Sequence, residues 1–193
     1  MPADDRFPWV EVTSVQALRD WLERHHTRTE AIWLVTWKKR VPERYVPHEH
    51  VLDQLVAFGW IDGIRRRLDD DRTRQLVSPR RTQPWARSYK DRAERLIATG
   101  VMHPAGLATV TRARASGMWD AMNDVDDLVV PHDLVEALAA RPPARENFDA
   151  FPPSTRRNIL RWIASAKTAI TRTKRITATA TEAQIDVQVK SNG

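Results

Sequence analysis

The alternation of hydrophobic and polar positions predicts a helix, a strand and a second helix near the start of the chain. Hydrophobic residues recur at helical spacing over residues 13–26. Residues 31–37 read AIWLVTW, and their β-branched and aromatic side chains on both alternating faces predict a strand covered on both sides. Helical spacing returns over residues 47–58, and Gly59 marks the end of that helix.

A basic hairpin is predicted next, and helices follow it. Residues 60–68 and 72–77 have the composition of strands around an acidic turn, so together with residues 31–37 they predict a small antiparallel sheet. Residues 171–181 are rich in threonine, whose helix propensity is poor, so a helix there depends on tertiary packing. The other predicted helices cover residues 88–99, 104–116, 134–140, 144–151 and 154–167.

The predicted fold class is therefore α+β, with a small antiparallel β-sheet packed by helices, followed by a C-terminal helical module. The polar stretch 123–131 is the best internal boundary in the pattern. We therefore expect an α+β domain over residues 1–122 and a helical module over residues 123–193. Residues 186–193 are expected to fray.

The composition excludes cysteine chemistry and argues against standard nucleotide and metal sites. The 193 residues include no cysteine, which excludes disulfides, thiolate catalysis and zinc sites with cysteine ligands. The six glycines form no G-x-G-x-x-G or P-loop motif, and His48 and His50 lack companions at the spacing of a metal site. We therefore expect no metal and no cofactor.

The composition is typical of a soluble globular protein, with 41% hydrophobic and 29% charged residues. No apolar run has the length of a membrane span, and the first residues lack the basic and apolar regions of a signal peptide. We expect a cytoplasmic bacterial protein without a membrane span.

The positive charge is concentrated in one stretch. Residues 65–95 hold eleven Lys and Arg against five acidic residues, an excess equal to the net charge of +6 of the whole chain. A second basic run, residues 156–175, has seven Lys and Arg and no acidic residue. Such localised charge indicates an anionic partner or substrate, although a solvated surface of internal salt bridges is the alternative.

The junction between the second helix and the hairpin is the candidate floor of a site. Residues 58–63 read FGWIDG, with Asp62 between an isoleucine and a glycine. Burial of Asp62 would favour its protonated form and suit it to acid–base catalysis, whereas the nearby arginines favour the charged form. In the alternative interpretation Asp62 is structural, and it accepts backbone hydrogen bonds or pairs with an arginine such as Arg80.

The hairpin arginines are expected on both faces of the sheet. Side chains alternate along a strand, so Arg65 and Arg67 should point to one face and Arg66 to the other. Arg72 and Arg74 are expected opposite them, and like charges facing each other across strands destabilise a sheet.

Three kinds of anion can neutralise these arginines. The acidic turn 69–71 can do so internally, and a phosphate or carboxylate ligand can do so from outside. Nucleic acid is the third, with Trp85 and Tyr89 as aromatics on which bases stack. Of the eight tryptophans, Trp60 and Trp85 flank the basic segment and are the better candidates for a pocket wall.

Several stretches of the chain resemble the YdeI/OmpD-associated family, which is also labelled bacteriocin-protection. The N-terminal stretches are AIWLVTWKK, then LVAFGWIDGIRRRLDDDRTRQLVSPRR before a tryptophan, then DRAERLIATGVMHPAGLATVTRARASGMWD. The tail, with ENFDAFPPSTRRNILRWIASAKTAITRTKRI, is similar to the helical module of that family. The resemblance covers roughly residues 10–180.

The resemblance implies a small cytoplasmic protein, α+β in front and helical behind, whose activity is generally unassigned. After PRR, family members typically carry a tryptophan flanked by serines and then an asparagine, whereas this chain has Ala86 and Tyr89 at the nearest positions. An altered pocket is therefore implied. The signature positions are Trp37, Lys38, Gly59, Trp60, Ile61, Asp62, Gly63, Pro79, Arg80, Arg81, Trp85 and Gly106.

We therefore predict a site for a small anionic or polar ligand, and the sequence leaves open whether the ligand is converted. Asp62 is the catalytic candidate. The alternative is a nucleic-acid-associated or stress-protection interaction protein that uses its basic surface. The predicted ligand-binding residues are Trp37, Lys38, Trp60, Arg65, Arg67, Arg80, Arg81 and Trp85.

Overall fold

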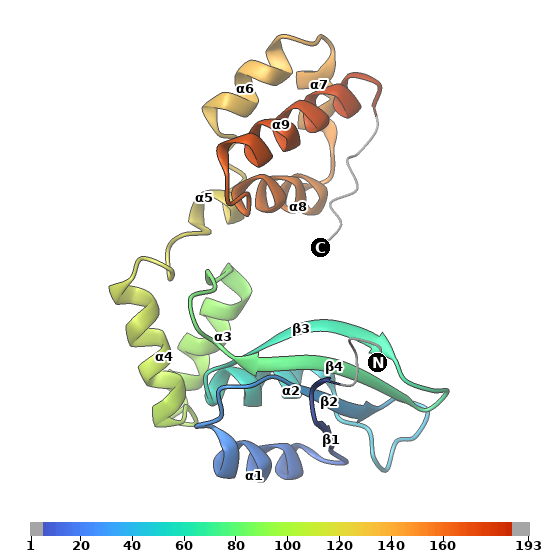
Figure 1. The fold of residues 1–193 in the computed structure, drawn as a ribbon, viewed down its shortest axis with the longest axis vertical. Helices are drawn as coiled ribbons and strands as arrows, with labels where there is room; N and C mark the ends of the chain where they lie inside the picture. Colours follow the sequence, from blue (N-terminus) through green and yellow to red (C-terminus); the bar gives the residue numbers. More distant parts are fainter. Residues whose placement is uncertain (1–5, 187–193) are drawn as a thin grey trace. The chain divides into compact units, whose positions relative to one another are not determined.

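The computed structural model describes residues 6–186, which form two compact units with the division between Asp120 and Ala121 (Figure 1). The first unit contains a four-stranded sheet and helices, and the second contains helices (Figure 1). The α+β class predicted from the sequence is confirmed. Most of the segment expected to fray, residues 187–193, lies outside the described residues.

The sheet of the first unit has the strand order β1-β2-β4-β3. The β2–β4 and β4–β3 pairs are antiparallel, as predicted, but β1 was not predicted and pairs in parallel with β2, so the sheet is mixed. The elements of this unit are β1 (Trp9–Glu11), α1 (Val15–His25), β2 (Ile32–Trp37), α2 (His48–Ala57), β3 (Trp60–Arg67), β4 (Arg72–Pro79), α3 (Arg87–Ala98) and α4 (Pro104–Ala115).

The two faces of the sheet differ in what covers them. All four helices contribute to one hydrophobic core on the first face, which we call the core face. The strand residues of the opposite face, which we call the outer face, lie outside that core. By register, the core face carries Val10, Ile32, Leu34, Trp60, Asp62, Arg65, Thr73, Gln75 and Val77. The outer face carries Trp9, Glu11, Trp33, Val35, Trp37, Arg66, Arg72, Arg74 and Leu76.

A β-bulge decides which residues share the core face with Asp62. Asp62 pairs with Val77 and Arg65 pairs with Gln75, so three residues of β3 span two residues of β4. In a regular strand, residues three apart point to opposite faces. The extra residue in β3 therefore brings the Arg65 side chain to the same face as Asp62.

Two glycines allow α2 and α4 to approach closely beside the start of β3. A Cβ atom on Gly106 would lie 2.2 Å from the backbone oxygen of Ala57, so only glycine fits there. Gly59 ends α2 with a φ of 75°, and its carbonyl oxygen accepts a hydrogen bond from the Arg80 backbone at 2.9 Å. The junction of α2 and β3 thereby fixes the end of β4.

The second unit has its own hydrophobic core, which includes Leu134, Phe148 and Ile159. Residues 123–131, expected to be a polar linker, instead contain a short helix that buries Val125 in this core. The Thr-rich segment is helical because Ile176 and neighbouring alanines pack into the same core. The helices are α5 (Asn123–Asp126), α6 (His132–Ala139), α7 (Ala144–Ala150), α8 (Pro153–Ala164) and α9 (Ala169–Gln184).

None of the helices within residues 6–186 combines the length and the apolar character that crossing a membrane requires.

Candidate functional site

A carboxylate with two side-chain donors lies where β3 meets α3. The hydroxyl of Tyr89 and the amide Nε2 of Gln75 both donate to Asp62, the latter at 2.8 Å. Asp62 and Tyr89 are half-buried, and Gln75 is buried. The two donors orient a carboxylate that keeps part of its surface in solvent.

These three residues come from different elements, and the sheet register and the following loop bring them together. Asp62 on β3 and Gln75 on β4 are diagonal neighbours on the core face. Tyr89 lies in the first turn of α3, so its hydroxyl reaches the sheet edge formed by β3. The nearby Trp85, whose backbone N–H donates to the Met118 oxygen at 3.0 Å, anchors the loop that positions this turn.

Polar groups continue along the core face from Asp62 toward the hairpin turn. The guanidinium of Arg65 donates to the Thr73 hydroxyl, with Nη2 at 3.1 Å, and this hydroxyl lies 3.2 Å from that of Thr36. The Arg65 side chain is exposed, and Thr36 is buried. A polar strip, made of Asp62, Gln75, Arg65, Thr73 and Thr36, therefore runs over β3, β4 and β2.

A buried guanidinium supports Tyr89 from behind. Arg80 is 3% exposed, and its guanidinium carbon lies 4.1 Å from the centroid of the Trp85 ring and 4.9 Å from that of Tyr89. Its Nη1 donates to the carbonyl oxygens of Gln83 and Pro84, at 3.3 and 3.2 Å. Its Nε is buried without a hydrogen-bond partner among the described residues. This arrangement fits a side chain that positions the site.

Burial lowers the pKa of Arg80 to about 10, and the negative charge of Asp62 opposes this shift. The charged form of Arg80 is therefore less favourable in the folded protein than in the unfolded chain. Above pH 10 the unfolded chain binds more protons at this position than the folded protein does, so the stability contributed by Arg80 should rise with pH.

This pH dependence is measurable against a variant without the charge. The free energy of unfolding of the wild type minus that of Arg80→Met should be constant below pH 9, and it should increase as pH rises through 10. Urea unfolding at a series of pH values gives the difference, in which the titration of groups distant from Arg80 cancels. A difference that is flat or falls across pH 10 would contradict the lowered pKa.

Trp60 and Trp85 lie in the hydrophobic core and not on an open pocket wall. Their exposures are 0% and 1%. Trp60 packs edge-on against Trp21, with ring centroids 5.6 Å apart, and Trp85 packs against Trp119. Burial of such large aromatic side chains stabilises the fold, so both can shape the site only from beneath.

Three predicted ligand-binding residues lie at the other end of the hairpin. Trp37 pairs with Arg72, five residues along β4 from the Val77 position opposite Asp62, a separation of about 17 Å in an extended strand. Lys38 Nζ donates to the carbonyl oxygens of Asp69 and Asp70, at 2.7 and 2.9 Å.

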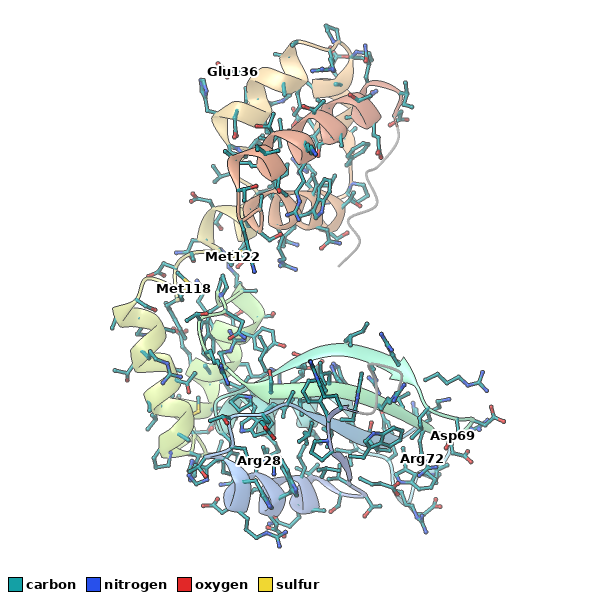
Figure 2. All side chains as sticks on the ribbon, viewed as in Figure 1. Arg28, Asp69, Arg72, Met118, Met122 and Glu136 are labelled. Atoms are coloured by element: carbon teal, nitrogen blue, oxygen red, sulfur yellow. The ribbon has the colours of Figure 1, made fainter. Side chains whose placement is uncertain are left out.

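The third of these residues, Arg67, forms an exposed ion pair with Asp70. Figure 2 shows Asp69 and Arg72 together at this tip of the hairpin, where their side chains are 2.8 Å apart. The acidic turn therefore neutralises the basic residues around it, which is one of the three interpretations of the hairpin arginines.

Arg81 is exposed although it follows the buried Arg80. Its Nη2 donates to the Thr29 oxygen at 2.8 Å, and its backbone N–H donates to Gln83 Oε1 at 2.7 Å. The structure therefore places Asp62 and Arg65 on one face of the sheet and Arg80 behind Tyr89. Trp60 and Trp85 lie in the core, and Trp37, Lys38 and Arg67 lie at the hairpin turn.

The sequence interpretation missed two residues of the site. Tyr89 was considered as a stacking aromatic and as a departure from the family pattern, but not as a partner of Asp62, and Gln75 was not considered. The alternation along β4 places Gln75 on the same face as Val77, so register could have identified it. A glycine within a strand often marks a bulge, so Gly63 was a usable signal for the position of Arg65.

Neither a metal site nor the pocket of the second unit gathers as many polar side chains as the surroundings of Asp62. Within residues 6–186, no group of three or more His, Asp or Glu side chains is arranged to hold a metal ion. The second unit has a pocket of about 240 Å³, with Val125, Leu160 and Ile163 among its apolar walls. Its arginine, Arg172, is already bound by Asp133, with Nε 2.7 Å from Oδ2.

Comparison with protein-family models matches two parts of the chain. Residues 10–109, which include the GWIDG and SPRR motifs, match the family described as Domain of unknown function (DUF8412). Residues 127–184, which include α6 to α9, match the family described as Bacteriocin-protection, YdeI or OmpD-Associated. The second match confirms the expected resemblance for this part of the chain. No curated protein and no solved structure matches.

Proposed function

We propose that this chain, which belongs to the family described as Domain of unknown function (DUF8412), binds a small anionic or polar ligand along the polar strip beside Asp62. The observation that carries the proposal is the half-buried Asp62 carboxylate, held by Tyr89 and Gln75 on the same face as the exposed Arg65. We also propose the bacterial cytoplasm as the location, which the resemblance to the YdeI/OmpD-associated family implies.

The polar strip suits a ligand with two kinds of functional group. The Asp62 carboxylate accepts hydrogen bonds, so it selects a hydroxyl or an amine of the ligand. The Arg65 guanidinium binds planar or tetrahedral anions, so it selects a carboxylate or a phosphate. A hydroxy acid or a sugar phosphate has both groups, and it would span the two side chains that the bulge places on one face.

The same pair gives Asp62 a chemical role if the ligand is converted. A carboxylate that faces a ligand hydroxyl can take its proton, and the Tyr89 hydroxyl is in contact with that carboxylate. Arg65 would then hold the negative charge of the ligand. Arg80, buried behind Tyr89, fixes the position of the phenol and does not contact the ligand.

A titration with three probes tests this proposal. Glycerol 3-phosphate carries both groups, whereas glycerol and inorganic phosphate carry one each. We expect glycerol 3-phosphate to bind more tightly than either, as measured by calorimetric titration of the full chain. Asp62→Asn and Arg65→Gln should each weaken this binding about tenfold or more, because each removes a hydrogen bond between charged or polar partners.

Arg67→Gln is the matched control, because Arg67 lies on the same strand and face but is paired with Asp70 at the turn. It should leave the affinity for glycerol 3-phosphate unchanged. Equal losses for the Arg65 and Arg67 variants, or no binding to the wild type by any of the three probes, would refute the proposal. Thermal unfolding of each variant checks the fold, and Arg65→Gln decides the result if Asp62→Asn is unstable.

A further inference from the structure

The pocket of the second unit has a floor of hydrophobic core side chains. Val125 of α5 and Leu160 and Ile163 of α8 are buried members of the core of this unit, and they also line the pocket. Helices α5, α8 and α9 all contribute to its wall (Figure 1). Its volume is about 240 Å³, whereas an apolar cavity of about 150 Å³ is large enough to hold a benzene molecule. The pocket can therefore take a phenyl ring with a short chain attached to it.

The mouth of the pocket is also partly apolar. Val129 is 52% exposed there, and Pro131 and Ala164 lie beside it in the lining. The backbone N–H of Val129 donates to the Asp124 carbonyl oxygen at 2.8 Å, and this hydrogen bond holds the turn that follows α5. A ligand with a hydrocarbon part would remove the Val129 side chain from water, which is favourable in proportion to the apolar area that is buried.

The guanidinium group of the pocket is already neutralised. Arg172, near the start of α9, donates from Nε and Nη2 to the two carboxylate oxygens of Asp133, at 2.7 and 2.9 Å. The hydrogen bond from Arg172 lowers the pKa of Asp133, so the pair is ionised at neutral pH. A ligand carboxylate would have to compete with Asp133 for the same donors. The pocket is therefore poorly suited to an anion.

Asp124 is the second charged residue in the lining of the pocket. It is exposed, and within residues 6–186 its carboxylate forms no hydrogen bond or ion pair. Because the charges of Arg172 and Asp133 offset each other, Asp124 gives the pocket wall a net negative charge. A cationic group at the mouth would be attracted by this carboxylate, and an anionic group would be repelled by it.

We propose that this pocket binds a small ammonium compound with an apolar group, such as an arylalkylamine. The hydrocarbon would lie on Val125, Leu160 and Ile163, and the ammonium group would face Asp124 at the mouth. The apolar floor and the net negative charge of the wall together select this class of ligand. The pocket belongs to the second unit, so the proposal is independent of the ligand proposed for the polar strip.

Three probes of similar shape and different charge test the proposal on the full chain. Phenethylamine, phenethyl alcohol and hydrocinnamate carry an ammonium, a hydroxyl and a carboxylate group on the same phenylethyl skeleton. NMR titration of the isotopically labelled protein gives the affinity of each probe and the place where it binds. We expect shifts of the Val125, Val129 and Ile163 amides. Phenethylamine should bind about two- to fivefold more tightly than the alcohol, as for an exposed ion pair, and hydrocinnamate should bind more weakly than both.

Two variants remove the charge of one carboxylate each. Asp124→Asn should weaken the binding of phenethylamine about two- to fivefold and leave that of the alcohol unchanged. Glu146→Gln is the matched control, because Glu146 is an exposed residue of α7 that does not line the pocket. It should retain the affinity for phenethylamine.

Two further variants test the place of binding. Ala164→Leu enlarges a side chain of the pocket wall and should weaken the binding of both the amine and the alcohol. Ala139→Leu is its control, because Ala139 is exposed at the last position of α6, as Ala164 is at the last position of α8, and it does not line the pocket. The NMR spectrum of each variant checks its fold.

Several results would overturn the proposal. One is that phenethylamine does not bind to the wild type, or binds no more tightly than hydrocinnamate. Another is an equal loss of affinity in Asp124→Asn and Glu146→Gln, which would show a general effect of charge. A third is an affinity that Ala164→Leu leaves unchanged, which would place the amine outside the pocket.

Discussion

Gly59→Ala is expected to lower the free energy of unfolding of the first unit by about 2–5 kcal/mol. Gly59 has a φ of 75°, a conformation that costs a residue with a side chain about 1–2 kcal/mol. An added Cβ would also lie 2.5 Å from the Thr109 hydroxyl and 3.0 Å from the Ala105 oxygen. Thr109 cannot easily move away, because its hydroxyl donates to that same oxygen at 2.9 Å.

Gly100→Ala separates the two parts of this cost. Gly100 has nearly the same φ, 70°, but an added Cβ would meet no atom within 4 Å. It should therefore show the conformational cost alone, about 1–2 kcal/mol. Urea unfolding followed by tryptophan fluorescence is a suitable measurement, because seven of the eight tryptophans belong to the first unit. Equal losses for the two variants would mean that the contact between Gly59 and α4 does not restrict the fold.

The consequence of Gly59→Ala should reach the polar strip. The Gly59 carbonyl accepts the Arg80 backbone N–H at 2.9 Å, so a shift of this junction displaces the residue that supports Tyr89. A variant that remains folded should therefore bind glycerol 3-phosphate more weakly than Gly100→Ala does. This links a backbone feature of the GWIDG segment to the geometry of the site.

The sequence predicted the larger elements well because hydrophobic periodicity dominates them. The strand over residues 31–37 and the hairpin around residues 69–71 were predicted within a residue or two. β1 was missed because three residues, Trp-Val-Glu, are too few to show a period. Its parallel pairing depends on α1, which connects β1 to β2 and lies against the core face.

The candidate site was predicted in part, and the limits have physical causes. Proximity in sequence grouped Trp37 and Lys38 with Asp62, but the extended strands place them about 17 Å away. Conversely, Tyr89 is 27 positions from Asp62 and reaches it only because the loop after β4 returns α3 to the sheet edge. Hydrophobic periodicity predicts helices and strands but not the path of the loops between them, so a contact such as Tyr89 to Asp62 is found only in the structure.

The neighbouring arginines of the SPRR motif show why one sequence pattern can contain two different roles. Arg80 is 3% exposed between two aromatic rings, and Arg81 is exposed at the surface. Both have the same side chain and both were expected to bind a ligand. The backbone at the end of β4 points one side chain into the core and the next away from it, so their substitutions should have very different effects.

Arg80→Ala is expected to lower the free energy of unfolding by about 2–5 kcal/mol, because it removes a large buried side chain and leaves a cavity in the core. The Gln83 and Pro84 carbonyls would lose their Nη1 donor, Asp62 would lose its nearby positive charge, and a cavity would open between Trp85 and Tyr89. Arg81→Ala should cost less than about 1 kcal/mol, since it loses one exposed hydrogen bond to Thr29.

Arg80→Met distinguishes the charge from the volume of the side chain. Methionine fills most of the same space without a charge, and replacing a buried ion by an apolar side chain of similar volume is often neutral or stabilising. Arg80→Met should therefore be more stable than Arg80→Ala in urea unfolding at neutral pH. If it is folded and yet binds glycerol 3-phosphate weakly, the guanidinium positions Tyr89 for the ligand.

The stability of Arg80→Ala relative to Arg81→Ala can contradict this account. If the two variants unfold within 1 kcal/mol of each other, the cluster of Arg80, Trp85 and Tyr89 is not part of the structural core, and the basis for placing the site beside it is lost.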